Sequence, residues 1–169
     1  MTDLSFRPLR PHEDAPLLHG WFTQPRGRFW GMGDKSVDEV RDVYAFVDSL
    51  EAHWAWVGER DGRPVALVQT YEPEHDPVAE AYAVRPCDLG AHVFVAPGED
   101  ADAVGAGIFA WAFADPAVHR LVGEPDAANR AILAVLERSG FELGERVRLG
   151  DKDARMVYLT RQRFESPGR

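Results

Sequence analysis

The sequence is poor in cysteine and in long apolar segments. Cys87 is the only cysteine among the 169 residues, which excludes an intrachain disulfide and a cysteine-rich metal site. A lone cysteine is seldom a nucleophile, so we assign Cys87 no catalytic role. No apolar run approaches the ~18 residues that a membrane span needs, and the first residues lack the apolar core of a signal peptide. We therefore expect a cytoplasmic protein with no membrane partner.

Basic residues are also fewer than acidic ones. The sequence contains 19 Lys and Arg against 28 Asp and Glu, which gives a net charge of −9. Such a surface repels a polyanion, so nucleic acid is not an expected partner. The six histidines, at positions 12, 19, 53, 75, 92 and 119, show no compact ligand spacing such as HExxH. We therefore predict no metal site.

Length and composition indicate one globular domain. A chain of this length suits a single domain over residues 1–169 with its own core. A hydrophobic share of 45% and a charged share of 28% are ordinary for such a domain. They do not distinguish a monomer from a homodimer.

Short local signals predict several element boundaries. Asp61-Gly62 lies between two apolar runs, a pattern that favours a β-hairpin. Ser36 followed three residues later by Glu39 predicts a capping box at the start of a helix. Asp14 is placed to cap the first expected helix, at residues 15–23.

The hydrophobic periodicity then gives the order of the elements. Alternation predicts strands at 3–9, 54–59, 64–71, 89–96, 119–124, 141–149 and 154–160. Helical spacing predicts helices at 15–23, 37–51, 101–114 and 127–139, with a long acidic loop over 72–86. An α/β class is expected, with a mixed sheet covered by helices on both faces.

Two polar residues occur where a strand is expected to pass into a helix. Asp126 is typical of a helix cap that accepts the N–H groups of Ala128 and Asn129. In the other interpretation its carboxylate faces a cleft, because open sheets bind ligands beyond the strand ends. The two roles can coexist. Asn129 either faces solvent or bonds to a ligand.

Two aromatic side chains also have a packing interpretation and a functional one. His92 alternates with apolar neighbours on its strand, as a hydrogen-bonded core histidine would. In a cleft the same imidazole would act as a general base or a substrate donor. Trp30 either packs beneath its loop or forms the wall of a substrate pocket.

Six motifs occur in one order along nearly the whole chain: RFWGM at 28–32, YEPEHDPV at 71–78, RPCDLGAHVFVA at 85–96, FADP at 113–116, GEPDAANRAI at 123–132 and SGFE at 139–142. With the element order, they resemble the GNAT superfamily of acyl-CoA-dependent N-acyltransferases. Within it they resemble the siderophore-biosynthesis branch of the aerobactin, mycobactin and desferrioxamine pathways. The resemblance implies a GNAT fold with a mostly antiparallel sheet. It also implies acyl-CoA, as acetyl-CoA or succinyl-CoA, as co-substrate.

The resemblance also implies residue roles. His92, of the G-x-H strand, and Asp126, of the E-P-D-x-x-N motif, would line the place where the acceptor amine is acylated. Trp30 of the FWG motif would bind the acceptor together with Glu124 and Asn129. The implied acyl-CoA contacts are Phe94, Val95, Ala96, Gly98, Ala101, Asp102, Ala103 and Arg130.

The expected phosphate loop departs from the family pattern. Many members carry Q/R-x-x-G-x-G/A at a helix N-terminus, where free N–H groups and the helix dipole favour phosphate. Residues 97–107 read PGEDADAVGAG, so Gly98 remains but Glu99 and Asp100 would repel phosphate. Gly105 and Gly107 fall inside the expected helix, where close packing would explain them.

We still expect phosphate binding at this loop. The backbone N–H groups over 98–103 would bind it, helped by Arg130 or Lys152. The N–H groups near Phe94 to Ala96 would polarise the thioester carbonyl.

The expected reaction is acyl transfer from acyl-CoA to the hydroxylamine nitrogen of N-hydroxylysine, N-hydroxyornithine or N-hydroxycadaverine, giving a hydroxamate. His92 would orient the nitrogen or receive its proton, while Asp126 holds the acceptor or the histidine. The acidic loop would attract the cationic end of the acceptor, or is simply solvated surface. One alternative is an aminoglycoside 6′-N-acetyltransferase, which has the same fold. Another is a non-catalytic GNAT-like binding module, suggested by the altered phosphate loop.

Overall fold

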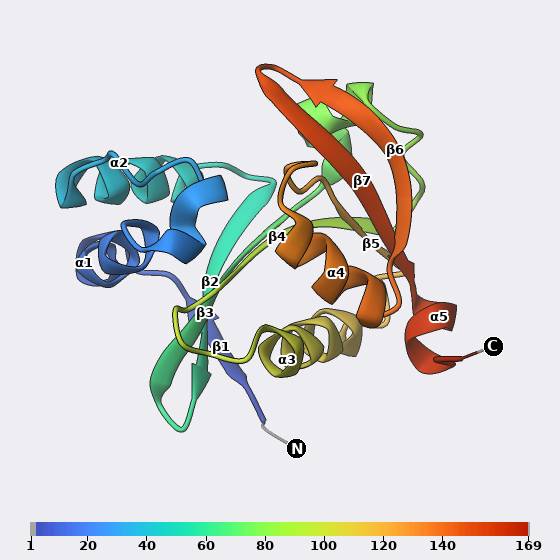
Figure 1. Ribbon diagram of the computed structural model, residues 1–169, viewed down its shortest axis with the longest axis horizontal. Coiled ribbons are helices and arrows are strands. Elements are labelled where there is room, and N and C mark those ends of the chain that lie inside the picture. Colours follow the sequence, from blue (N-terminus) through green and yellow to red (C-terminus); the bar gives the residue numbers. More distant parts are fainter. Residues whose placement is uncertain (1–2, 169) are drawn as a thin grey trace.

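The computed structural model describes residues 3–168, which form a seven-stranded sheet (Figure 1). Its strand order is β1-β2-β3-β4-β5-β7-β6. Every pair of neighbours is antiparallel except β4 and β5, which run parallel, so the sheet is mixed and mostly antiparallel as expected. The strands are β1 (Ser5–Pro8), β2 (His53–Arg60), β3 (Arg63–Tyr71), β4 (Asp88–Val95), β5 (Arg120–Gly123), β6 (Glu142–Leu149) and β7 (Lys152–Thr160).

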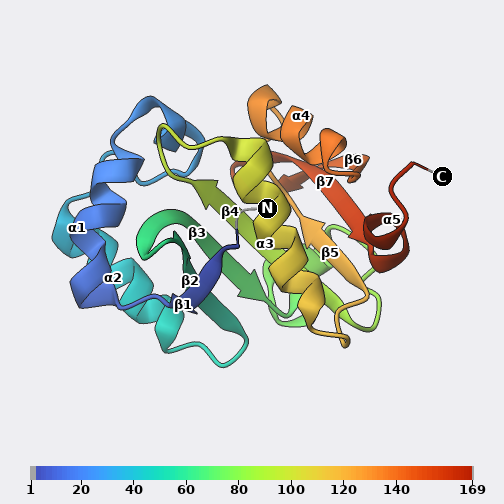
Figure 2. The ribbon, with the colours of Figure 1, turned by 90° about the horizontal axis from the view of Figure 1, so that it is seen from below.

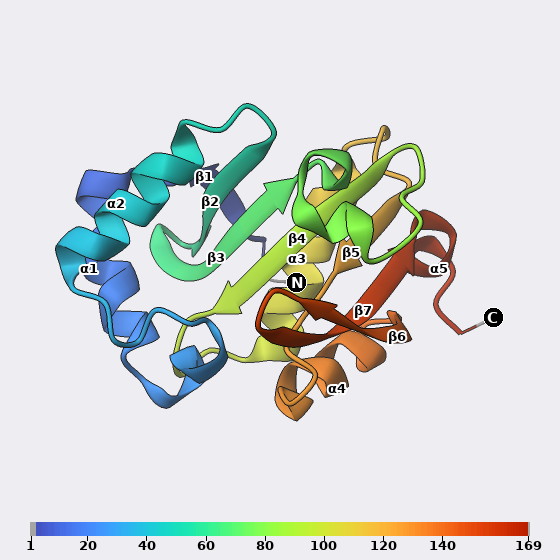
Figure 3. The same cartoon turned by 90° about the horizontal axis from the view of Figure 1, so that it is seen from above.

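Helices cover both faces of the sheet, as Figures 2 and 3 show from below and from above. One face carries α1 (Pro11–Phe22) and α2 (Val37–Asp48), and the other carries α3 (Ala101–Ala114) and α4 (Arg130–Arg138). A short α5 (Arg161–Glu165) follows β7. None of the helices within residues 3–168 is long and apolar enough to cross a membrane.

Two apolar cores lie on either side of the sheet. Phe94 of β4 packs with Leu67 of β3 beneath α1 and α2. Val95 and Val68 belong to the opposite core, with Ile108 of α3. This alternation along β4 confirms the pattern predicted for residues 89–96, because successive side chains of a strand point to opposite faces.

Local chemistry explains the boundaries that were predicted correctly. Asp61 and Gly62 both adopt positive φ, 52° and 74°, and close the β2–β3 hairpin. The Ser36 side chain accepts the Glu39 N–H, and the Glu39 carboxylate accepts the Ser36 N–H, which forms the predicted capping box of α2. Gly140, with φ of 96°, follows the end of α4, because glycine adopts the left-handed conformation that commonly ends a helix.

The first helix begins earlier than predicted. It starts at Pro11, so Asp14 lies inside its first turn rather than capping it. The Asp14 carboxylate instead accepts two hydrogen bonds of 2.8 Å from the Arg7 guanidinium and one from the Arg10 N–H. Proline favours the first turn of a helix because it has no N–H to leave unpaired.

The helix after β5 begins later than the predicted residue 127. The Pro125 carbonyl accepts the Arg155 N–H, and the Ala127 N–H donates to the Asp153 carbonyl, both at 2.9 Å. Asp126 therefore lies on a bridge to β7. Its carboxylate accepts the N–H of Ala128, but not that of Asn129 as predicted. Asn129 caps α4 in its place and accepts the Ile132 N–H. Pairing with β7 delays the helix by three residues.

Further differences lie outside the predicted helices and strands. Residues 72–86 contain two short 3-10 helices, Pro73–His75 and Pro77–Glu80, and a third spans Pro25–Phe29. Within α3, a Cβ at Gly107 would lie 2.7 Å from the Leu4 side chain, which supports the packing role predicted for this glycine.

The parallel pair β4–β5 is short and is held at one end. Only three register pairs join it, from Asp88–Arg120 to Gly90–Val122. At the first of them, Arg120 donates two hydrogen bonds of 2.7 Å to the Asp88 carboxylate. These side chains are 9% and 1% exposed. Beyond Val122 the strands separate, although β4 continues to Val95.

Asp88→Asn is expected to lower the free energy of unfolding by about 3 kcal/mol, because Arg120 keeps a buried charge without a carboxylate partner. The matched control is Asp102→Asn, which breaks a bidentate pair with Arg138 at 50% and 58% side-chain exposure. This control should cost less than about 1 kcal/mol. Urea denaturation measures both values; equal losses would contradict a special role for the Asp88–Arg120 pair.

Candidate functional site

A cleft of about 860 Å³ opens where β4 and β5 separate. Its floor is formed by β4 and by the chain that follows β5. Its walls come from residues 25–32, the first half of α3 and the side of α4. The separation of two neighbouring strands thus exposes backbone edge and side chains that a continuous sheet would cover.

His92, Glu124 and Lys152 meet in this cleft. His92 on β4 is hydrogen bonded through Nε2 to the Glu124 carboxylate just after β5. The Lys152 ammonium, at the start of β7, donates to the same carboxylate and to the Glu124 carbonyl, the latter at 2.8 Å. The Glu124 side chain is 6% exposed, whereas that of His92 is 36% exposed. A buried anion therefore lies beneath an accessible imidazole.

The surroundings of Glu124 keep it ionised. Burial raises its pKa, but the hydrogen bond from His92 and the charges of His92 and Lys152 outweigh burial and lower the pKa from 4.5 to about 2. An ionised carboxylate only accepts hydrogen bonds, so Nε2 of His92 carries the hydrogen. In the neutral imidazole the free lone pair is then on Nδ1, which has no hydrogen-bond partner among residues 3–168.

Tyr71 is a third donor to Glu124. Its buried hydroxyl lies 3.4 Å from the carboxylate, and its ring packs between the His53 and His92 rings. The ring passes so close to β4 that a Cβ at Gly90 would lie 2.2 Å from it. Gly90 of the G-x-H motif is thus explained by the close approach of Tyr71.

The structure brings many of the predicted site residues into one cleft. His92 and Asp126, predicted as catalytic, line it together with Trp30, Glu124 and Asn129. Among the predicted acyl-CoA contacts, Phe94, Val95 and Ala101 also line it, whereas Ala96, Gly98, Asp102, Ala103 and Arg130 do not.

Several of these side chains already have partners within the protein. Trp30 donates from Nε1 to the Tyr44 hydroxyl at 3.2 Å and stacks on Phe22, so it combines packing with a place on the wall. Glu124 lies beneath His92 rather than open to an acceptor. The side chains of Asp126 and Asn129 accept backbone N–H groups while their residues border the cleft.

Not all of the expected amides of β4 face the cleft. The Ala96 N–H donates to the Val65 carbonyl of β3 at 2.9 Å and is not free for a thioester. Because N–H groups of alternate residues point to the same neighbouring strand, the Phe94 N–H also points to β3. The Val95 N–H points the other way, to the edge from which β5 has separated. Only this amide of the three matches the prediction.

The phosphate loop is also partly occupied. Asp100 caps α3, and its carboxylate accepts the N–H groups of Asp102 and Ala103. These two N–H groups are therefore not free to bind phosphate as expected, because the carboxylate of Asp100 lies where a phosphate would accept them. Among residues 3–168, the amides of Gly98 and Ala101 have no such partner.

The other charges near the loop also differ from expectation. Glu99 is paired with Arg60 and Arg63, so its charge is compensated rather than free to repel phosphate. Arg26 donates to the carbonyls of Ala96 and Glu99 and ties residues 25–29 to this loop. Lys152, expected near the phosphate, is paired with Glu124 instead.

Sequence reasoning missed the contacts of Lys152 and Tyr71 with Glu124. Both residues are distant from it in the chain, by 28 and 53 positions, and neither belongs to a local pattern that points to a carboxylate. The available signal was the buried Glu124 itself, since a buried carboxylate needs hydrogen-bond donors.

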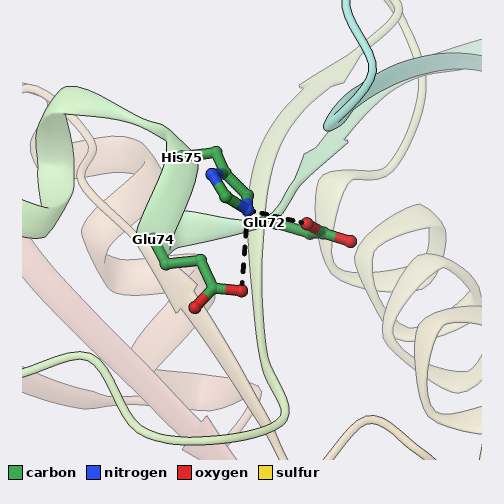
Figure 4. A group of neighbouring side chains, drawn as sticks. All are labelled: Glu72, Glu74 and His75. Carbon is green, nitrogen blue, oxygen red and sulfur yellow. Dashed lines mark ion pairs between the residues drawn. The ribbon is translucent and has the colours of Figure 1, made fainter.

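Another cluster lies apart from this site on the exposed segment after β3. Glu72, Glu74 and His75 bring one ligand atom each within 4.8 Å of the others (Figure 4). The His75 Nε2 atom lies 3.5 Å from Glu72 and 3.7 Å from Glu74, and all three side chains are at least half exposed. Exposed acidic groups commonly gather in this way on a protein surface without an ion, so we assign the cluster no metal.

The low pKa of Glu124 predicts acid sensitivity. A carboxylate whose pKa is lowered by folding stabilises the protein above its ordinary pKa, and this contribution is lost as the pH falls through 4.5 towards about 2. The stability advantage of the wild type over Glu124→Gln should shrink by about 3 kcal/mol between pH 6 and pH 2. Urea denaturation at several pH values measures it, with the exposed Glu74→Gln as control. A stability difference between wild type and Glu124→Gln that does not change with pH would contradict the lowered pKa of Glu124.

Two curated proteins are similar to nearly the whole chain. N(6)-hydroxylysine O-acetyltransferase of Escherichia coli is 27% identical over 170 residues, which cover 95% of this chain and 53% of the relative. N-hydroxyputrescine acetyltransferase of Acinetobacter baumannii is 26% identical over 171 residues, covering 96% and 80%. The chain thus spans about half the length of the first relative and four fifths of the second.

A solved structure shows the same fold. AAC(6′)-Ib in complex with paromomycin and acetyl-CoA superposes with a TM-score of 0.84 at 22% identity, over 99% of this chain and 98% of that one. Residues 10–149 match the model of the acetyltransferase (GNAT) domain. Because this match covers most of the chain, the protein belongs to the GNAT acetyltransferase family.

Proposed function

We propose that the protein transfers an acyl group, acetyl or succinyl, from acyl-CoA to the nitrogen of an N-hydroxylated amine and so forms a hydroxamate for siderophore biosynthesis. The observation that carries the proposal is the His92–Glu124 pair within the cleft at the β4–β5 separation. The two relatives named for N-hydroxylysine and N-hydroxyputrescine support the choice of acceptor.

The pair places a proton acceptor in the cleft. An N-hydroxyamine is much less basic than an alkylamine, so it arrives neutral, with its nitrogen lone pair available for attack. Its nitrogen attacks the thioester carbonyl, the C–N bond forms and the C–S bond breaks. Nδ1 of His92 takes the proton of the nitrogen, while Glu124 stabilises the imidazolium that results. The CoA thiolate leaves and is protonated from solvent.

The backbone of β4 stabilises the oxygen of the carbonyl under attack. The Val95 N–H points to the open edge of the strand, where negative charge develops in the transition state. Asp126 and Asn129 border the same region and position the acceptor. Direct transfer needs no protein nucleophile, in keeping with an exposed Cys87 that lies outside the cleft lining.

The names of the two relatives favour this acceptor over an aminoglycoside. The charged residues that line the cleft are of both signs, with Arg26, Arg28 and Lys152 against Glu124 and Asp126, so they do not decide between the two acceptors. The likeness to AAC(6′)-Ib, at 22% identity, concerns the fold. The altered phosphate loop had suggested a non-catalytic module, but family membership and the open cleft support an enzyme.

Turnover should be selective for N-hydroxyamines. CoA release is measured with acetyl- and succinyl-CoA against N-hydroxylysine, N-hydroxyornithine, N-hydroxycadaverine, the unhydroxylated amines and kanamycin. His92→Ala is expected to lower kcat about 100-fold, because a general base contributes at least that much. His75→Ala, at the exposed segment after β3, is the matched control. Turnover with kanamycin alone would overturn the proposal.

Asp100→Ala is expected to lower the KM for acyl-CoA about fivefold. The substitution frees two N–H groups of α3 and removes a negative charge close to the bound phosphate, worth about 1 kcal/mol. It should also cost about 1 kcal/mol of stability, because the helix loses its cap. Asp115→Ala at the other end of α3 is the control. A raised KM in Asp100→Ala would show that the phosphate binds elsewhere.

A further inference from the structure

A second hollow, of about 610 Å³, lies on the other side of the site. It shares His92, Glu124 and Lys152 with the cleft and extends away from α3 and α4. One wall is the segment of 3-10 helices between β3 and β4, and the other is the β6–β7 hairpin, which Figure 1 shows side by side. The hollow and the cleft therefore meet at His92. An acceptor in the hollow would reach His92 from one side, and an acyl group in the cleft would reach it from the other.

The two walls of the hollow carry opposite charges. Asp76 and Glu80 lie on the wall of 3-10 helices. Asp76 is engaged by His53 at 3.0 Å and by the Val78 N–H, whereas Glu80 is exposed and has no ion-pair partner within residues 3–168. Glu80 is thus the carboxylate on this wall that is free to bind a cation.

The hairpin wall supplies the opposite charge through Arg148. Its side chain is 63% exposed and lies 3.7 Å from Asp153. Arg146 lies 3.6 Å from the same carboxylate, so one anion serves two guanidinium groups. Arg148 lines the hollow and Arg146 does not. A cation that is only partly compensated therefore faces the hollow.

We infer that this hollow binds the distal end of an α-amino acid acceptor, with Arg148 holding its carboxylate and Glu80 its ammonium group. The inference rests on the proposed function and narrows it to an N-hydroxylated amino acid. A side chain such as that of lysine would pass Val78 and Leu149 on the way to His92. A diamine keeps an ammonium group for Glu80 but lacks the carboxylate that Arg148 would hold, so it loses one charge-assisted contact.

N6-hydroxylysine and N-hydroxycadaverine test this directly, because they differ only by the α-carboxylate. The wild type should prefer N6-hydroxylysine about tenfold or more in kcat/KM, as expected for one charge-assisted contact. Arg148→Gln should lower kcat/KM for N6-hydroxylysine to the level of N-hydroxycadaverine. Arg146→Gln removes a guanidinium from the same strand and the same Asp153, and should keep the preference.

The ammonium contact has its own comparison. The wild type should turn over N6-hydroxylysine faster than its Nα-acetyl derivative, and Glu80→Gln should abolish this difference. Glu74→Gln, an exposed acid of the same segment outside the hollow, should not. A difference that survives in Glu80→Gln would overturn the role of Glu80.

The outcomes separate the inference from the proposed function. Equal turnover of the two N-hydroxyamines, or a preference that survives in Arg148→Gln, overturns the inference and leaves hydroxamate formation standing. No turnover of these two or of N-hydroxyornithine overturns the proposed function. In that case, calorimetric titration with L-lysine and cadaverine decides the inference. Tighter binding of lysine that is lost in Arg148→Gln supports it, and equal or absent binding overturns it.

Discussion

The separation of β4 from β5 is the constraint on which the site depends. The pair is held at one end by the buried Asp88–Arg120 contact and by three register pairs, and it is open at the other end. Without the closed end the two strands would have no fixed angle, and without the open end β4 would have no free edge. The cleft, the outward amide of Val95 and the position of His92 all follow from this arrangement.

A buried charge is the second constraint on the site. Glu124 is almost fully removed from water, which is costly unless several donors compensate the carboxylate. Lys152, Tyr71 and His92 supply those donors from three different strands. The compensation fixes the position of His92 and decides which nitrogen of its ring is free. The electrostatics of the interior thus determine the chemistry available at the surface of the cleft.

Features written in a few neighbouring residues were predictable from the sequence. The Asp61-Gly62 turn and the Ser36–Glu39 capping box depend on local backbone preferences alone. The start of α4 was predicted wrongly because the residues before it pair with β7, a contact that no local pattern encodes. The motifs placed His92 and Glu124 in one site, but their contact and the role of Lys152 depend on how distant strands meet.

The close approach of Tyr71 to Gly90 has a consequence for how such a sequence can diverge. Any side chain at position 90 collides with the ring at position 71, so the first change must occur at 71. Loss of that ring makes space but also removes a donor from Glu124. Each substitution is therefore harmful in the background of the other wild-type residue, and the two positions are epistatic. Positions 71 and 90 can therefore change only after another residue has come to donate a hydrogen bond to Glu124.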